Sequence, residues 1–287
     1  MKTRIAFLCS VVLSLALNCA AMDKGYQTVE FSPARLGGMP VKFNIILPRD
    51  YATTDRRYPV LYLLHGYTDD YSAWVTKSNL LLHAPAYEEI IVMPEGGTGW
   101  YMNNQGDKKL EWEDYLIQDL IPYVDGHYRT VATRQGRAIA GLSMGGYGAM
   151  TLGLRDPDLF AAIASMSGAL SSAQAGFYAA LSSNPKIKKV IEDDFGAPDN
   201  AVRTSEDPFE LIKKVPADKL PQLYISIGSS DFLLDSNRDF IKLLTQLKIP
   251  FRYSEVPGKH EWPVWDEQIQ VILALQAPVI GAAKAWP

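Results

Sequence analysis

Cysteine is almost absent from this sequence of 287 residues. The only two, Cys9 and Cys19, lie within the first twenty residues. Residues 1–21 are predicted below to be a cleaved leader, so the mature chain would contain no cysteine. That excludes a disulfide framework, a thiol nucleophile and a cysteine-based metal site. The fold must then depend on an apolar core, and roughly 265 residues are enough for one domain to build one.

Positive charge and histidine are also scarce. The chain has 28 Lys and Arg against 32 Asp and Glu, for a net charge of −4, and no basic run interrupts it. This balance argues against a nucleic-acid partner. Beyond residue 21, no apolar stretch approaches the length of a membrane span, so no integral membrane segment is predicted after the leader. The four histidines show no H-E-x-x-H or paired spacing, so neither a metal site nor a cofactor is predicted.

The first 21 residues have the organisation of a secretory signal peptide. Lys2 and Arg4 form a basic start, Ile5 to Leu17 is mostly apolar, and Cys19 to Ala21 offers small residues for cleavage. The alternative is a lipoprotein anchored at Cys19, although Asn18 is a poor residue before such a cysteine. The prediction is therefore a secreted or periplasmic protein in which residues 22–287 form a single domain.

Short apolar runs alternate with helical patterns along the rest of the chain. This alternation predicts an α/β fold, with a mostly parallel central sheet and helices on both faces. The first two strands are joined by a Gly37-Gly38 turn and predict an antiparallel N-terminal edge. The predicted strands are Thr28–Phe31, Val41–Leu47, Val60–Leu64, Glu89–Met93, Ala138–Gly141, Phe160–Met166, Gln222–Ile227 and Phe251–Val256. The longer predicted helices cover Trp112–Tyr128, Ser236–Leu247 and Trp265–Ile280.

One segment interrupts the alternation, at about residues 168–221. Serine, proline and glycine clusters divide it into short helical pieces, and it is too long for a simple connection. It predicts a helical excursion over the carboxyl edge of the sheet. Such an excursion could wall a substrate pocket, or it could simply pack on the flank.

Residues 141–145 read Gly-Leu-Ser-Met-Gly, a G-x-S-x-G pentapeptide between a predicted strand and a predicted helix. Strand, sharp turn and helix form the context of a nucleophile elbow, in which small neighbours tolerate a strained turn. The pattern predicts Ser143 as a nucleophile whose hydroxyl stands clear of the sheet.

A serine nucleophile needs a base and an acid, and in folds built on such an elbow the chain order is serine, acid, histidine. Only His260 follows Ser143, in a loop just after the last predicted strand, which makes it the predicted general base. Asp231 ends the loop after strand Gln222–Ile227 and is the predicted acid, with Asp235 as the alternative.

The oxyanion of a tetrahedral intermediate needs hydrogen-bond donors. The N–H of Met144, directly after the nucleophile, is one candidate. The second is the N–H of Tyr67, where Gly66 permits close approach and His65 orients the loop. Trp100, Tyr101 and Trp262 are candidate substrate contacts, because aromatic side chains suit sugar or phenolic rings.

Four segments together resemble the esterase D family of α/β-hydrolases, in order from about Val41 to Trp265. These are Tyr62–Gly66, Gly141–Ala149, Ile227–Asp231 and Gly258–Trp262. The family includes S-formylglutathione hydrolases, feruloyl and acetylxylan esterases, enterochelin esterases and mycolyltransferases. The resemblance implies an α/β-hydrolase fold, a triad of Ser143, Asp231 and His260, and an oxyanion hole at Tyr67 and Met144.

The leader argues against a formylglutathione hydrolase, whose substrate is intracellular, and an enterochelin-type esterase would usually carry an additional N-terminal domain. The expected activity is a secreted serine carboxylesterase acting on short-chain or aromatic acyl esters. The substrate would be a small-molecule or polysaccharide-linked ester, for example one cleaved by a feruloyl or acetyl esterase on plant polysaccharide. An acyltransferase of the mycolyltransferase type and a non-catalytic, hydrolase-like binding module remain as alternatives. The sequence does not define the oligomeric state.

Overall fold

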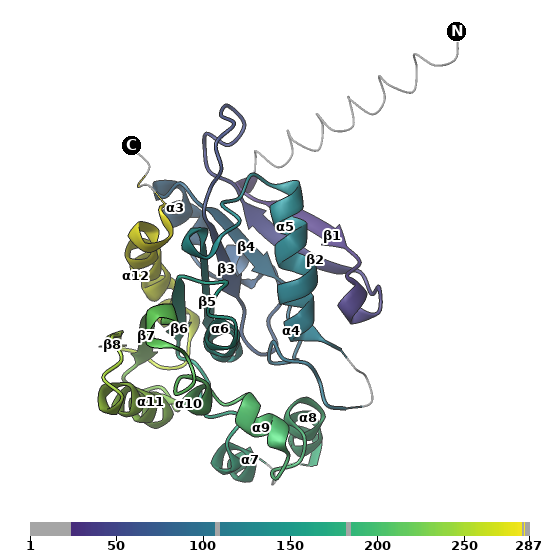
Figure 1. Cartoon of the computed structure of the whole chain (residues 1–287), viewed down its shortest axis with the longest axis vertical. Coiled ribbons are helices and arrows are strands. Elements are labelled where there is room, and N and C mark those ends of the chain that lie inside the picture. Colours follow the sequence, from purple (N-terminus) through teal and green to yellow (C-terminus); the bar gives the residue numbers. More distant parts are fainter. Residues whose placement is uncertain (1–23, 107–109, 182–184, 283, 285–287) are drawn as a thin grey trace.

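The computed structural model of the chain describes residues 24–106, 110–181, 185–282 and 284. The predicted signal peptide, with Cys9 and Cys19, lies outside these residues. An eight-stranded sheet in the order β1-β2-β4-β3-β5-β6-β7-β8 forms the centre of the molecule (Figure 1). The strands are β1 (Gln27–Phe31), β2 (Val41–Ile46), β3 (Val60–Leu64), β4 (Ile90–Pro94), β5 (Arg137–Leu142), β6 (Ala162–Met166), β7 (Gln222–Gly228) and β8 (Arg252–Val256).

The sheet is parallel except at its N-terminal edge. β1 pairs antiparallel with β2, and β2 pairs antiparallel with β4. Every pairing from β4 through β3, β5, β6 and β7 to β8 is parallel. The predicted mostly parallel sheet with an antiparallel edge is therefore confirmed. In such a sheet the carboxyl ends of the parallel strands share one edge, where side chains from distant parts of the sequence can meet.

Helices cover both faces of the sheet. Successive residues of β3 alternate between two apolar cores: Tyr62 packs in one, and Leu61 and Leu63 pack in the other. In Figure 1, α12 lies on one side of the sheet and α5 and α6 lie on the other. The helices are α2 (Ala73–Lys77), α3 (Leu80–His83), α4 (Trp112–Asp114), η3 (Tyr115–Leu120), α5 (Ile121–His127), α6 (Met144–Arg155), α7 (Ala175–Leu181), α8 (Pro185–Phe195), α9 (Ala201–Ser205), α10 (Pro208–Leu211), α11 (Leu234–Gln246) and α12 (Trp262–Ile280). The short 3-10 turns are η1 (Ala34–Leu36), η2 (Ala84–Ala86), η4 (Arg134–Gly136) and η5 (Ala217–Lys219). None of the helices in the described part of the chain combines the length and hydropathy needed to span a bilayer.

The helix predicted at Trp112–Tyr128 contains a central π-helical section, which is wider than an α-helix. α4, η3 and α5 follow one another without a break, and η3 is π-helical. Pro122 is the second residue of α5, and proline has no N–H to donate to the carbonyl four residues earlier. A π turn is one way in which a helix accommodates such an interruption.

The segment between β6 and β7 contains α7, α8, α9, α10 and η5. Figure 1 places α7, α8 and α9 beyond the sheet. Arg155, at the end of α6, ties this segment to the body by ion pairs with Glu113 and with Glu206, the latter at 2.7 Å. The Tyr147 hydroxyl of α6 donates to the Glu206 carbonyl at 2.7 Å. The helix that follows the elbow is therefore bonded directly to the excursion.

Glu89 is a buried acid just before β4, remote in sequence from the elbow. Its carboxylate accepts hydrogen bonds from the Gln276 amide of α12 at 3.2 and 3.3 Å. Burial raises the pKa of Glu89 from its ordinary 4.5 to about 8, although the Gln276 hydrogen bond acts in the opposite direction. At neutral pH the folded protein therefore favours the protonated acid.

This shift predicts a pH-dependent stability that Glu89→Gln removes. Because the folded-state pKa exceeds the unfolded one, the stabilisation is complete below about pH 4.5 and is lost as pH rises to about 8. We expect the glutamine variant to match the wild type near pH 4 and to exceed its free energy of unfolding by roughly 2–4 kcal/mol at pH 8. Urea unfolding across this range measures the difference. Glu88→Gln, a change at the partly exposed neighbouring residue, is the control. The prediction would be contradicted if the free energies of unfolding of wild type and Glu89→Gln changed with pH in parallel.

Candidate active site

The pentapeptide forms a sharp turn between β5 and α6. Ser143 has φ 53° and ψ −115°, outside the regions that non-glycine residues normally occupy. Its N–H donates to the Met166 carbonyl of β6 at 2.9 Å, which ties the turn to the neighbouring strand. A side chain at Gly145 would begin 2.5 Å from the His65 carbonyl oxygen, so α6 can start here only if this residue is glycine.

The structure brings Ser143, His260 and Asp231 together. The Ser143 Oγ lies 2.8 Å from His260 Nε2. The other ring nitrogen, Nδ1, lies 2.9 Å from Asp231 Oδ2 and 3.1 Å from Oδ1. These three residues follow β5, β8 and β7 respectively, so the shared carboxyl edge of the parallel sheet accounts for their proximity.

Asp231 defines which nitrogen of His260 carries the proton. The carboxylate can only accept hydrogen bonds, so Nδ1 donates to it and Nε2 is left to accept the Ser143 hydroxyl. Burial by itself would raise the pKa of Asp231, but hydrogen bonds from His260 and from the Leu233 N–H outweigh it and lower that pKa below its usual value. The acid is therefore ionised at neutral pH. Asp235, the alternative acid, is exposed in the first turn of α11.

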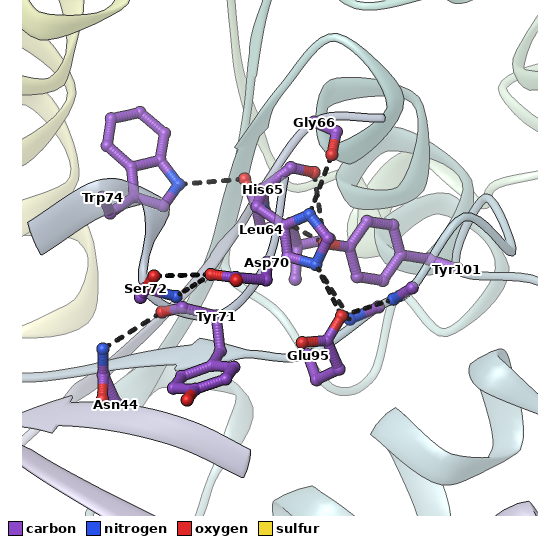
Figure 2. Close-up of polar contacts among 12 residues, drawn as sticks. Asn44, Leu64, His65, Gly66, Asp70, Tyr71, Ser72, Trp74, Glu95 and Tyr101 are labelled. Carbon is purple, nitrogen blue, oxygen red and sulfur yellow. Dashed lines mark hydrogen bonds and ion pairs between the residues drawn. The ribbon is translucent and has the colours of Figure 1, made fainter. Parts of the chain in front are cut away.

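Hydrogen bonds of the His65 ring hold the loop after β3 in place. Figure 2 shows the buried His65 ring between the Gly66 carbonyl and the loop that begins at Glu95. Nδ1 is 2.8 Å from the Gly66 oxygen, and Nε2 accepts the Gly96 N–H at 2.9 Å. With Nε2 accepting from Gly96, Nδ1 is the nitrogen that donates to the Gly66 carbonyl. His65 thus links the loop after β3 to the loop after β4.

Three further hydrogen bonds, made by two side chains, support the same loop. The Tyr101 hydroxyl accepts the His65 N–H at 3.0 Å and donates to the His65 carbonyl at 3.2 Å. The indole of Trp74 donates to the Leu64 carbonyl at 3.0 Å (Figure 2). The backbone on both sides of His65 is therefore restrained on several sides.

This loop lies against the elbow. A side chain at Gly66 would begin 2.6 Å from the Leu142 side chain and 3.5 Å from the Ser143 Cβ, so glycine lets the two turns meet. Met144 is the first residue of α6, and the first N–H groups of a helix have no carbonyl partner within it. The two residues predicted to supply oxyanion donors therefore belong to adjoining turns. The Tyr67 side chain itself is 41% exposed.

The three predicted substrate contacts have different surroundings. Tyr101 is buried and uses its hydroxyl on His65, so it has no face open to a substrate, and its place is structural. Trp100 is 8% exposed; its ring packs near Tyr67 at 6.1 Å and near Phe195 of α8 at 5.4 Å. Trp262 begins α12 and packs edge-on against Trp74 at 5.2 Å.

Sequence reasoning did not find two rings that contact His260. The buried Trp265 approaches the imidazole edge-on at 5.0 Å, and Phe232 lies 4.7 Å away at an angle of 51°. The position of Phe232 directly after Asp231 in the chain was the one sequence feature that could have indicated its contact with His260. In the described part of the chain, no group of three His, Cys, Asp or Glu side chains is arranged to hold a metal ion.

A mostly parallel sheet covered on both faces, with a strained serine turn before a buried helix, defines the α/β-hydrolase class. The family model described as "Putative esterase" matches residues 34–275. The chain therefore belongs to this esterase family and is a serine hydrolase acting on carboxylic esters, which confirms the resemblance found in the sequence.

The chain is similar both to named esterases and to a solved serine hydrolase structure. The chain is 28% identical over 216 residues to an acetyl esterase of Caldicellulosiruptor saccharolyticus, covering 73% of this chain and 79% of that protein. It is 31% identical over 253 residues to esterase Rv1288 of Mycobacterium tuberculosis, covering 80% of this chain but only 54% of that protein. Its fold matches that of FphF, a fluorophosphonate-binding serine hydrolase of Staphylococcus aureus, with a TM-score of 0.78 and 27% identity over 87% of this chain and 97% of the other.

Proposed function

We propose that the chain is a secreted serine carboxylesterase whose nucleophile is Ser143. His260 serves as general base and Asp231 orients and stabilises its imidazole. The observation that carries this proposal is the unbroken chain of hydrogen bonds from Ser143 Oγ to His260 Nε2, at 2.8 Å, and from His260 Nδ1 to Asp231, at 2.9 Å. A nucleophile, a base within hydrogen-bond reach and a third group that orients the base are what covalent catalysis of this kind requires.

The proposed reaction has two steps. His260 Nε2 takes the Ser143 proton as Oγ attacks the carbonyl carbon of the ester, and the same nitrogen then protonates the departing alcohol. Water repeats the sequence on the acyl-enzyme and releases the acid. The N–H groups of Met144 and Tyr67 are the proposed donors to the oxyanion, and removing one such donor typically costs about 3–4 kcal/mol of transition-state stabilisation. The bonds that restrain the loop at His65 support this role, because a donor must be fixed before the charge develops.

The proposed substrates are short-chain or aromatic acyl esters, including those of a feruloyl or acetyl esterase that acts on plant polysaccharide. Likeness to an acetyl esterase over 73% of the chain supports the short acyl group. Trp100 and Trp262 remain proposed contacts to sugar or phenolic rings. For Trp100 the supporting observation is its packing beside Tyr67, whose N–H is a proposed oxyanion donor.

Secretion is proposed on the sequence of residues 1–21, which would leave residues 22–287 as one catalytic domain. Lipid anchoring at Cys19 is the alternative. Expression in a secreting host followed by N-terminal sequencing of the exported protein tests this: a start at or next to Met22 supports cleavage by signal peptidase. A blocked, lipid-modified terminus at Cys19 would favour the anchor.

A panel of esters tests the proposed activity. We expect the chain purified without residues 1–21 to hydrolyse p-nitrophenyl acetate, an acetylated xyloside and methyl ferulate, with measurable differences in kcat/KM among them. Liberated acid is followed by pH-stat, and products are separated by chromatography with and without a sugar acceptor. Ester products in place of free acid would favour the acyltransferase alternative. The absence of both products would favour the binding module.

A further inference from the structure

Phe232 is a large apolar side chain left in solvent beside the proposed catalytic histidine. It is 77% exposed, and its ring centre lies 4.7 Å from that of His260. Trp265 contacts the same imidazole from the buried side. His260 thus has one aromatic neighbour in the core and one at the surface.

The backbone around Asp231 keeps Phe232 pointing outward. The Asp231 N–H donates to the Gly228 carbonyl at 3.0 Å, and the Leu234 N–H donates to the Asp231 carbonyl at 3.1 Å. Asp231 and Leu233 are both buried, so the residue between them faces solvent. A single exposed apolar residue is ordinary on protein surfaces, and exposure alone decides nothing. What distinguishes Phe232 is that its ring contacts the imidazole that must deliver a proton.

The direction of that proton locates the alcohol half of the ester. To protonate the leaving oxygen, His260 Nε2 must come within about 3 Å of it. The atoms attached to that oxygen then lie close to the imidazole. The Phe232 ring lies close to the same imidazole, with its centre 4.7 Å from that of His260. The acyl half is bonded to the carbonyl carbon, whose oxygen faces Met144 and Tyr67.

We propose that Phe232 is a specificity-determining residue for the alcohol half of the substrate. Its ring packs against the apolar face of a sugar or aryl group attached to the leaving oxygen. This inference rests on the proposed function, in which His260 takes the Ser143 proton as the Oγ–acyl bond forms and then returns it to the alcohol as the carbonyl carbon–alkoxy bond breaks. It adds a preference for ring-bearing alcohols over small aliphatic ones. The same contact would act on an acceptor alcohol in the reverse step.

The test compares two esters that share an acyl group. Ethyl acetate and a mono-acetylated xyloside both give the acetyl-enzyme, so they differ only in the alcohol. For Phe232→Ala we expect kcat/KM to fall about tenfold with the xyloside acetate, the size of one aromatic stacking contact, and less than twofold with ethyl acetate. The deacylation rate, measured after stopped-flow acetylation with p-nitrophenyl acetate, should stay within twofold, because the alcohol has left by then.

Two matched variants accompany this measurement. Phe232→Tyr keeps the ring and should retain the wild-type preference. Leu82→Ala truncates a side chain of α3 that is 75% exposed, and it should change neither ester. Equal losses with both esters in Phe232→Ala, together with slower deacylation, would mean that the ring only shields the Asp231–His260 hydrogen bond from water, and the proposal would fall. A wild-type protein that cleaves neither ester would overturn the proposed function, and this inference with it.

Discussion

Ser143→Ala is expected to lower kcat for p-nitrophenyl acetate by about 10⁶-fold, the loss typical when the nucleophile of such a triad is removed. Its Oγ is the oxygen that lies 2.8 Å from His260 Nε2, so the variant leaves the base with no hydroxyl to deprotonate. Alanine matches serine in size apart from this oxygen, and the backbone of the turn is held by the Ser143 N–H bond to Met166. The fold should therefore persist while acylation stops.

The measurement is the burst of p-nitrophenolate and the mass of the protein after it. Wild-type protein should gain one acetyl group, and Ser143→Ala should gain none. The control is Ser205→Ala, which removes an exposed hydroxyl of α9 that is bonded only locally, to the Val202 carbonyl. A burst near one equivalent in Ser143→Ala would show that another residue is acylated.

The strands could be predicted from the sequence because buried parallel strands are short apolar runs bounded by turn residues. Val60–Leu64 matches β3 in full, and the other predicted strands differ from the observed ones by one or two residues at their ends. The apolar spacing predicts that α12 starts at Trp265, but the helix starts at Trp262. Pro263 at the second helical position was the overlooked signal, since proline is tolerated in a first turn. The π-helical section at η3 could not be predicted, because the spacing of the apolar residues there is that of an ordinary α-helix.

The proximity of Ser143, Asp231 and His260 could be predicted because each lies in the turn or loop that follows a strand of one parallel sheet. The surroundings of Tyr101 could not. Trp100 and Tyr101 both have positive φ, at 54° and 57°. Bulky residues rarely adopt this backbone conformation, so their sequence gives no sign of the turn that it produces. Tyr101 ends up buried beneath the loop at His65 instead of in a binding site. The contact between Phe232 and His260 likewise depends on two loops that meet only in the folded chain.

Asp231→Asn is expected to lower kcat by about 10⁴-fold without unfolding the protein. The Asp231 carboxylate accepts the Nδ1 proton of His260 at 2.9 Å, which leaves Nε2 free to accept from Ser143. An asparagine amide can instead donate to Nδ1, and the proton then moves to Nε2, where it blocks the base. The stabilising charge for the imidazolium is lost as well. The low pKa of Asp231 in the folded chain means that the wild-type carboxylate supplies this charge throughout the neutral range.

Asp235→Asn is the matched control, because it makes the same chemical change four residues away at an exposed position in α11. We expect it to retain wild-type kcat. Steady-state hydrolysis of p-nitrophenyl acetate from pH 6 to 9, with the tautomer of His260 followed by ¹⁵N NMR, separates the two aspartates. If Asp231→Asn kept Nδ1 protonated and lost less than tenfold in rate, orientation of the imidazole would have to come from its ring contacts with Trp265 and Phe232. Because such contacts select a ring position but not a tautomer, the large loss in Asp231→Asn is the outcome that the geometry requires.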